Sequence, residues 1–252
     1  VNRPGVGQNL QDHYQMRTVV QMRSRDSLNN QIRNPISLLK MGLDWAFRGR
    51  GALTVGAGQV GGAMRTDFAP TDQPDLQLFV MPLSVDKPGE PLHRYPGFTS
   101  AIWQCHPKSR GSIEIVTPDP TADPKIQPNY LADELDQKTM VEGIRILRQI
   151  YNQPKFRGLW DAEIVPGEQV KTDADIIDAI RKGGGTVYHP VGTCKMGIDA
   201  AAVVGPDLLV HGVTGLRVVD ASIMPLITSA NTNAPTLMIA EKAAEMILAS
   251  GN

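Results

Sequence analysis

The sequence predicts a mixed α+β chain, in which an antiparallel sheet is followed by three helices. Short apolar stretches between residues 51 and 130 alternate with Gly, Pro and Asp, which is the pattern of strands joined by turns. Apolar residues at helical spacing follow near 140–151, and a longer apolar stretch occupies 233–250. The 252 residues are 41% apolar and 20% charged, a globular composition that suits one large domain or two smaller ones.

Three stretches have strand character within the predicted sheet. They read DLQLFVMPL (75–83), FTSAIWQCH (98–106) and GSIEIVTP (111–118). Two Asp-Pro pairs at 119–120 and 123–124 mark turns after the last of them. We therefore expect an antiparallel sheet here, preceded by a loop over 1–13 with its Pro-Gly and Val-Gly pairs.

Helix signals follow the sheet. Met140, Ile144, Leu147 and Tyr151 recur at spacings of four, three and four, which predicts one buried helix face that ends before Pro154. A second helix is expected to open at Thr172, since Asp175 three residues later completes a capping-box pattern, and to close near Gly183.

The C-terminal segment predicts a strand, a loop and a helix. GLRVVDAS (215–222) has the apolar run of a buried strand and ends on an acid. NAPTLMIAEKAAEMILAS (233–250) predicts the longest apolar helix, with Asn233 as its cap and Pro235 in its first turn. A polar loop between a strand end and a helix N-terminus is a common place for a ligand, although it is equally the ordinary cap of a core helix.

A glycine pattern at 56–61, GAGQVG, matches the dinucleotide-binding spacing. That spacing has a mechanism only when a strand leads into the glycines and a helix leaves them. Here further glycines and an early proline follow. We interpret the stretch as flexible strand or loop rather than as a cofactor site.

Charge and cysteine content exclude several functions. The net charge is −1 with scattered basic residues, which gives no electrostatic case for nucleic acid. No apolar run is long enough for a membrane span. Two cysteines, Cys105 and Cys194, form neither a disulfide framework nor a metal signature. We expect reduced thiols in a cytoplasmic protein without a metal site.

His189, in TVYHPVGTCKMG (186–197), is the candidate catalytic residue. Pro190 favours an extended backbone at His189, and nearby glycines allow close backbone approach. An imidazole held in this way can accept a proton at neutral pH. A structural role, a metal site, or a thiol–imidazole pair with Cys194 remain open alternatives at this point.

Several motifs, taken together, resemble the glucose–methanol–choline (GMC) family of flavin-dependent oxidoreductases, especially its choline- and alcohol-dehydrogenase-like members. They run in family order over nearly the whole chain: PGVGQNLQDH (4–13), HPKSRGSIEI (106–115), DPKIQPNYL (123–131), YHPVGTCKMG (188–197) and LRVVDASIMPLITSANTNAPTLMIAEKAAEMI (216–247). The resemblance implies oxidation of an alcohol C–OH group with hydride passing to N5 of FAD, and it favours a catalytic base at His189 over a structural or metal-binding histidine. A cysteine-dependent hydrolase using Cys194 ranks far below it.

The resemblance also implies site residues. His189 corresponds to the family's base, and Asn231 to the partner that binds the substrate oxygen and faces it across the substrate. Flavin contacts are implied at Asp220, Ala221, Asn231, Thr232, Asn233 and Thr236. His13, His93, His106 and His211 are expected to be structural.

The family's dinucleotide fingerprint is not found in these residues. The resemblance therefore implies the C-terminal portion of a longer enzyme, with a missing N-terminal FAD-binding half as a partner. Its expected parts are a linker or FAD-domain remnant (1–13), an antiparallel substrate-binding domain with flanking helices (14–185), and the last strand and helix of a Rossmann-like FAD domain with the catalytic motif (186–252). Alone, such a chain is expected to be inactive, to bind FAD weakly or not at all, and to favour association into homo-oligomers. The alternative is a non-catalytic or split binding module of the same fold.

Overall fold

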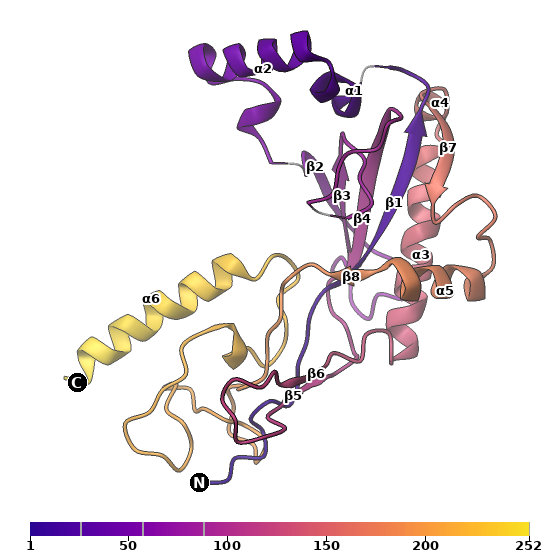
Figure 1. Cartoon of the computed structure of the whole chain (residues 1–252). Helices are drawn as coiled ribbons and strands as arrows, with labels where there is room; N and C mark the ends of the chain where they lie inside the picture. The colour runs from indigo at the N-terminus through magenta and orange to yellow at the C-terminus, as the bar shows by residue number, and fades with distance from the viewer. Residues whose placement is uncertain (26, 57, 88, 252) are drawn as a thin grey trace. The chain divides into compact units, whose positions relative to one another are not determined.

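The computed structural model describes residues 1–25, 27–56, 58–87 and 89–251, and Figure 1 traces the chain. Its internal contacts divide it into two compact units. Unit 1 comprises Val1–Tyr14, Gln104–Gln137 and Thr186–Asn252; unit 2 comprises Gln15–Trp103 and Lys138–Gly185. The domain boundaries expected after residues 13 and 185 stay a prediction.

Unit 2 is built on the main sheet, whose strand order is β2-β3-β4-β1-β7. The strands are β1 (Tyr14–Met22), β2 (Val60–Met64), β3 (Leu76–Met81), β4 (Gly97–Gln104) and β7 (Trp160–Val165). β4 is buried along its whole length, and it lies between β3 and β1 in the sheet. β1 and β4 run antiparallel, with Thr18 opposite Ser100. The strands predicted within 75–83 and 98–106 are confirmed as β3 and β4.

Helices α3 (Glu134–Tyr151) and α5 (Asp173–Gly183) confirm the two predicted amphipathic helices. The capping box at the start of α5 is present, with the Thr172 hydroxyl accepting from the Asp175 amide. α3 packs closely on the sheet at Gly143, where an added Cβ would lie 2.6 Å from Ile102 of β4. A short helix, α4 (Pro154–Arg157), follows α3.

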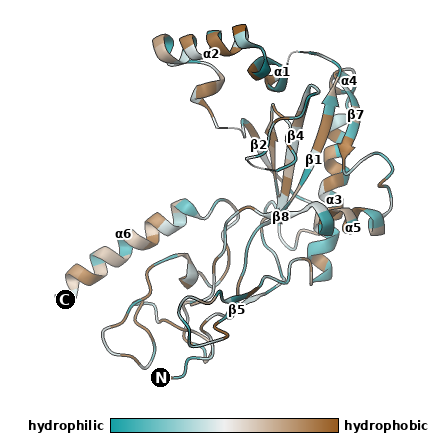
Figure 2. Ribbon diagram, in the orientation of Figure 1, coloured by the Kyte–Doolittle hydropathy of each residue, from teal (hydrophilic) through white to brown (hydrophobic). Residues whose placement is uncertain are grey.

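Two helices that were not predicted, α1 (Leu28–Arg33) and α2 (Pro35–Arg48), are joined at Asn34. The Asn34 side chain caps α2 by accepting from the amides of Ile36 and Ser37. None of the α2 residues is buried, and Figure 2 colours parts of this helix as hydrophobic. A 3₁₀ turn, η1 (Ala52–Thr54), follows.

The GAGQVG stretch leads into β2 rather than into a helix. Ala57 lies outside the described residues, while Gly58 and the residues after it are described. Val60–Met64 pairs antiparallel with β3. The described part of the stretch therefore lacks the helix N-terminus that a dinucleotide site needs.

Unit 1 contains little regular structure. It has a two-stranded antiparallel sheet, β5 (Ser112–Glu114) with β6 (Lys125–Gln127), a two-residue strand β8 (Gly185–Thr186) at its boundary, a 3₁₀ turn η2 (Ala221–Ile223), and helix α6 (Asn233–Ala249). β5 is shorter than the strand predicted over 111–118. The core of unit 1 is an apolar cluster that includes Val191, Val204, Ile223 and Ile239.

A buried carboxylate organises the 107–110 segment of unit 1. Asp136 is 2% exposed. Its oxygens accept from the amides of Lys108 and Ser109, both at 2.8 Å, and from the Ser109 hydroxyl at 2.5 Å. A side chain therefore supplies here the pairing that a regular element would give through its backbone.

Two C-terminal predictions are corrected. Residues 215–222 form no strand, because their ladder is limited to one bridge between Leu209 and Arg217. A strand needs a partner along its length, and here the pairing with residues 208–210 extends over a single bridge. α6 does begin at Asn233, but Thr232 occupies the cap position and makes no side-chain cap hydrogen bond.

Candidate active site

His189 lies in a loop of unit 1 whose backbone is held from several sides. It is 7% exposed, and its amide donates to Asp12 Oδ1 at 2.9 Å. The preceding residue, Tyr188, has a left-handed backbone with φ of 63° and is exposed. A bulky residue seldom adopts this conformation, and such strain often marks a functional loop.

Asp12 is the anchor of this loop. Besides the His189 amide, its carboxylate accepts from the Tyr130 hydroxyl and the Thr186 hydroxyl, both at 2.5 Å. Asp12 is 7% exposed, so these donors supply the stabilisation that water would otherwise give to the charge. No sequence pattern singled out Asp12.

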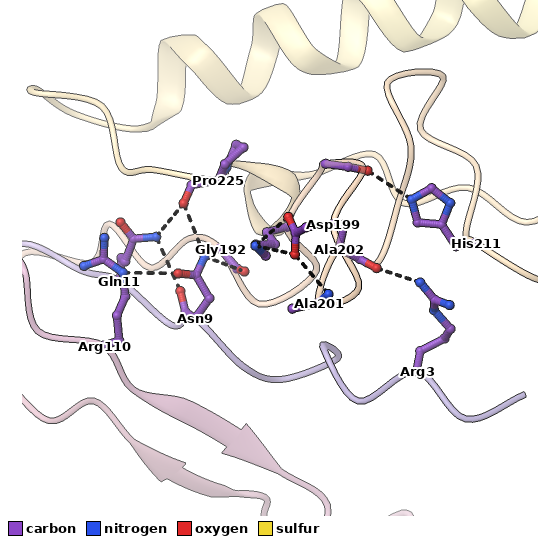
Figure 3. A network of polar contacts seen from close by, with 12 residues as sticks. Arg3, Asn9, Gln11, Arg110, Gly192, Asp199, Ala201, Ala202, His211 and Pro225 are labelled. Atoms are coloured by element: carbon purple, nitrogen blue, oxygen red, sulfur yellow. Dashed lines mark hydrogen bonds and ion pairs between the residues drawn. The ribbon is translucent and has the colours of Figure 1, made fainter.

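A second network ties the chain before His13 to the segments on either side of the site (Figure 3). The side-chain amide of Gln11 donates to Pro225 O at 3.0 Å, and the side-chain amide of Asn9 donates to Gly192 O at 3.2 Å. Arg110 Nε donates to Asn9 Oδ1 at 3.1 Å. Four sequence-distant segments are thus fixed relative to one another within unit 1.

The His189 imidazole has a neighbour at each ring nitrogen. Nε2 lies 3.2 Å from Asn231 Nδ2, so the structure brings together the two residues predicted as the catalytic pair. Nδ1 lies 2.9 Å from His13 Nδ1. The other nitrogen of His13, Nε2, lies 3.0 Å from Cys105 O. His13 was expected to be structural; it is the last residue of the motif PGVGQNLQDH, which was the only sequence signal for it.

Burial lowers the pKa of both imidazoles. His13 is 0% exposed, and desolvation is the main cause that lowers its pKa to about 4. Desolvation also lowers the His189 pKa, against the opposing effect of the Asp12 carboxylate. Both rings are therefore neutral at pH 7, and neutral is the form in which an imidazole can accept a proton.

The residues expected to contact a flavin lie around the start of α6 and before η2. Asp220 is exposed and caps η2 by accepting from the Ser222 amide at 2.8 Å, while Ala221 opens that turn. Thr232 is buried and its carbonyl accepts from the Thr236 hydroxyl at 2.7 Å. Asn231 and Asn233 are exposed.

These residues fit a flavin ring in the chemistry of their donors. The first turn of α6 has no side-chain cap, so its amide N–H groups can donate to an electron-rich group. Thr228 has a buried hydroxyl oxygen without a hydrogen-bond partner among the described residues. A buried hydroxyl of this kind normally has a partner.

A reactive thiol or a metal site at His189 finds no support in the geometry. Burial raises the pKa of the Cys194 thiol, which disfavours the thiolate that a nucleophile needs. Among the described residues, no group of three or more His, Cys, Asp or Glu could hold a metal ion. Nor does any described helix combine the length and apolar character needed to cross a membrane.

The side chains of the remaining histidines make hydrogen bonds with groups other than His13 and His189. His211 Nε2 lies 3.0 Å from Gly197 O, and His93 pairs with Asp86. His106 Nε2 lies 3.1 Å from the Ser229 hydroxyl, two residues before Asn231. Of the histidines expected to be structural, His13 is the one whose ring contacts His189.

Comparison with known proteins gives a family for these features. The model of the GMC oxidoreductase family matches residues 107–240. An alcohol dehydrogenase [acceptor] of Pseudomonas putida is 42% identical over 97% of this chain and 44% of its own length. An oxygen-dependent choline dehydrogenase of Paraburkholderia xenovorans is 38% identical over 97% of this chain and 43% of its own length. The chain therefore spans less than half the length of these curated relatives.

Solved structures agree with this family. A structure of Aspergillus oryzae RIB40 formate oxidase, which concerns FAD modification in that protein, has a TM-score of 0.90 at 25% identity. It covers 99% of this chain and 48% of the formate oxidase chain. The pyridoxine 4-oxidase structure has a TM-score of 0.78 at 28% identity, with 97% of this chain covered.

Proposed function

The chain belongs to the GMC oxidoreductase family, and from this premise we propose that it supplies the catalytic base of an FAD-dependent enzyme that oxidises an alcohol C–OH group. The observation that carries the proposal is the contact between His189 Nε2 and Asn231 Nδ2 at 3.2 Å. It joins a neutral, buried imidazole to an amide donor at the edge of α6. His189 takes the hydroxyl proton of the substrate at Nε2, the ring nitrogen that faces Asn231.

Asn231 binds the same oxygen. An amide N–H placed beside the base can donate to the substrate hydroxyl oxygen and, as the proton leaves, to the developing alkoxide. Because Asn231 is exposed while His189 is buried, a bound alcohol can approach the pair from the side of Asn231. Asp12 keeps the base in position by holding its backbone amide.

FAD, when bound, supplies the hydride acceptor. The residues that would hold it are those at the start of α6, whose backbone N–H groups can donate to an electron-rich ring system, together with Asp220 and Ala221. The relatives named above support the cofactor through the formate oxidase structure and the alcohol substrate through the dehydrogenase names. Most of the dinucleotide would be bound by a part of the protein outside these residues.

The test is the loss of turnover on removal of the base. In the FAD-loaded protein that carries this chain, His189→Ala should lower kcat with a primary alcohol by at least about 10²-fold, the low end of a general base's contribution. His211→Ala is the matched control, because His211 contacts Gly197 O and has no place in the proposed chemistry. It should keep kcat within about 3-fold.

The alternative of a non-catalytic binding module makes the opposite prediction. A flavin-loaded protein that turns over no alcohol under any acceptor would favour the module. Near-normal turnover in His189→Ala would refute the assignment of the base while leaving the family membership intact.

A further inference from the structure

The two imidazoles form a directional chain of hydrogen bonds that begins at a fixed acceptor. Cys105 O can only accept, and it lies 3.0 Å from His13 Nε2. This nitrogen must therefore carry a proton. His13 is fully buried, and desolvation lowers its pKa so that it is neutral at pH 7; a neutral imidazole has one N–H only. Its Nδ1 is then left as an acceptor.

The protonation of His13 determines the donor in the next hydrogen bond. His13 Nδ1 faces His189 Nδ1 at 2.9 Å, and two acceptors at that distance would repel. His189 Nδ1 must therefore carry the proton and donate. Because His189 is neutral as well, its Nε2 has a lone pair, and the Asn231 amide is the donor that meets it at 3.2 Å. Every contact is satisfied in this single arrangement.

We propose that His13 is a positioning residue that holds neutral His189 in the Nδ1–H tautomer and so keeps the Nε2 lone pair directed at the substrate site. The inference rests on the proposed function of His189 and goes one step further. With the opposite tautomer, His189 would present an N–H to the alcohol and could not take its proton. A wrongly protonated imidazole is costly in enzymes, as the loss of an orienting carboxylate in a serine-protease triad demonstrates.

Three groups hold the two imidazoles in this arrangement. The Asp12 carboxylate holds the His189 backbone amide, the Cys105 carbonyl holds His13, and the Asn231 amide meets the far side of the His189 ring. The rings meet edge to face, with an interplanar angle of 85°. This geometry directs one ring nitrogen at the other and excludes stacking as the reason for the contact.

The variants His13→Asn and His13→Gln separate the two contacts of His13. An Asn oxygen at the Nδ1 position keeps the acceptor for His189, whereas a Gln amide at the Nε2 position keeps the donor to Cys105 O and loses that acceptor. We expect kcat to fall at least about 10-fold in His13→Gln and to stay within about 3-fold in His13→Asn. A merely structural role would give no such order between the two.

The tautomer itself is measured by nitrogen NMR on the FAD-loaded protein that carries this chain, labelled with ¹⁵N-histidine. The His189 signals are assigned by their loss in His189→Gln. We expect an N–H-type shift at Nδ1 and a lone-pair-type shift at Nε2 in the wild type and in His13→Asn, with the pattern exchanged in His13→Gln. An N–H-type shift at wild-type Nε2, or an unchanged pattern in His13→Gln, would overturn the proposal.

The two proposals fail separately. If His189→Ala turns over normally, the base assignment falls, although the NMR measurement still determines the tautomer. If His189→Ala is inactive while wild-type His189 carries its proton at Nε2, the base stands and the role of His13 falls. Once His189→Gln has assigned the His189 signals, the wild-type spectrum decides this point, even where a His13 variant does not fold.

Discussion

His13 makes the stability of this protein sensitive to acid in a defined pH range. Its pKa is lowered from 6.5 to about 4 in the folded protein. Between about pH 4 and pH 6.5 the unfolded chain therefore binds a proton at His13 that the folded chain does not bind. Unfolding therefore takes up protons below pH 6.5. This contribution to stability is complete above the unfolded pKa and is lost as the pH falls toward the folded pKa.

The magnitude follows from the same two values. Each unit of pKa difference corresponds to about 1.4 kcal/mol. For one group with folded and unfolded pKa values of about 4 and 6.5, lowering the pH from 7 to 5 reduces the free energy of unfolding by about 2 kcal/mol. His189 contributes in the same direction, because its pKa is lowered too.

The assay compares urea unfolding of the wild type and His13→Asn from pH 8 to pH 5. Asn cannot titrate but keeps the acceptor that His189 needs, so groups common to both proteins cancel in the difference. We expect the stability advantage of the wild type over the variant to decrease by about 2 kcal/mol across this range. A difference that stays constant with pH would refute the buried, neutral state of His13 on which the tautomer argument depends.

Three further substitutions test the supports of the site. Asp12→Ala should lower the free energy of unfolding by about 3 kcal/mol, since it leaves three donors without their acceptor, whereas Tyr130→Phe should cost about 1 kcal/mol; equal losses in urea titrations would contradict this. Gly192→Ala should cost at least about 2 kcal/mol, because φ is 95° and the added Cβ would lie 2.5 Å from a backbone oxygen; Gly158→Ala, with open space around it, should leave the melting temperature nearly unchanged. Asp136→Ala should speed amide hydrogen exchange at residues 108 and 109 and cost about 3 kcal/mol, as three donors lose their acceptor; unchanged exchange would count against its anchoring role.

The features that the sequence predicted well depend on local signals. Helix α5 needed only Thr172, Asp175 and the glycines at its end, all within a few residues of one another. The strand predicted over 215–222 was wrong because a strand depends on a partner, and an apolar run does not reveal whether one is available. Helix α2 was missed although Ile36, Leu39 and Leu43 recur at helical spacing, and it buries none of its residues.

The same distinction accounts for what was found of the site. Family-like motifs identified His189 and Asn231, which the structure brings to 3.2 Å, and their catalytic roles remain a prediction. His13 and Asp12 were missed, although both lie in a quoted motif. The two imidazole nitrogens at 2.9 Å belong to residues 176 positions apart. Neither residue type nor spacing reveals that His13 Nε2 contacts the Cys105 carbonyl, and that contact determines which ring nitrogens carry protons.

The burial of His13, which lowers the stability of the protein in acid, also determines which nitrogen of His189 carries the proton at neutral pH. An exposed His13 would titrate near its ordinary pKa and, once charged, would donate from both nitrogens. Its Nδ1 would then compel His189 Nδ1 to accept, which moves the remaining His189 proton to Nε2 and removes the base. Because desolvation lowers the His13 pKa to about 4, the acceptor for His189 Nδ1 is preserved well below neutral pH. The cost in acid stability and the direction of the proton chain therefore have one physical cause.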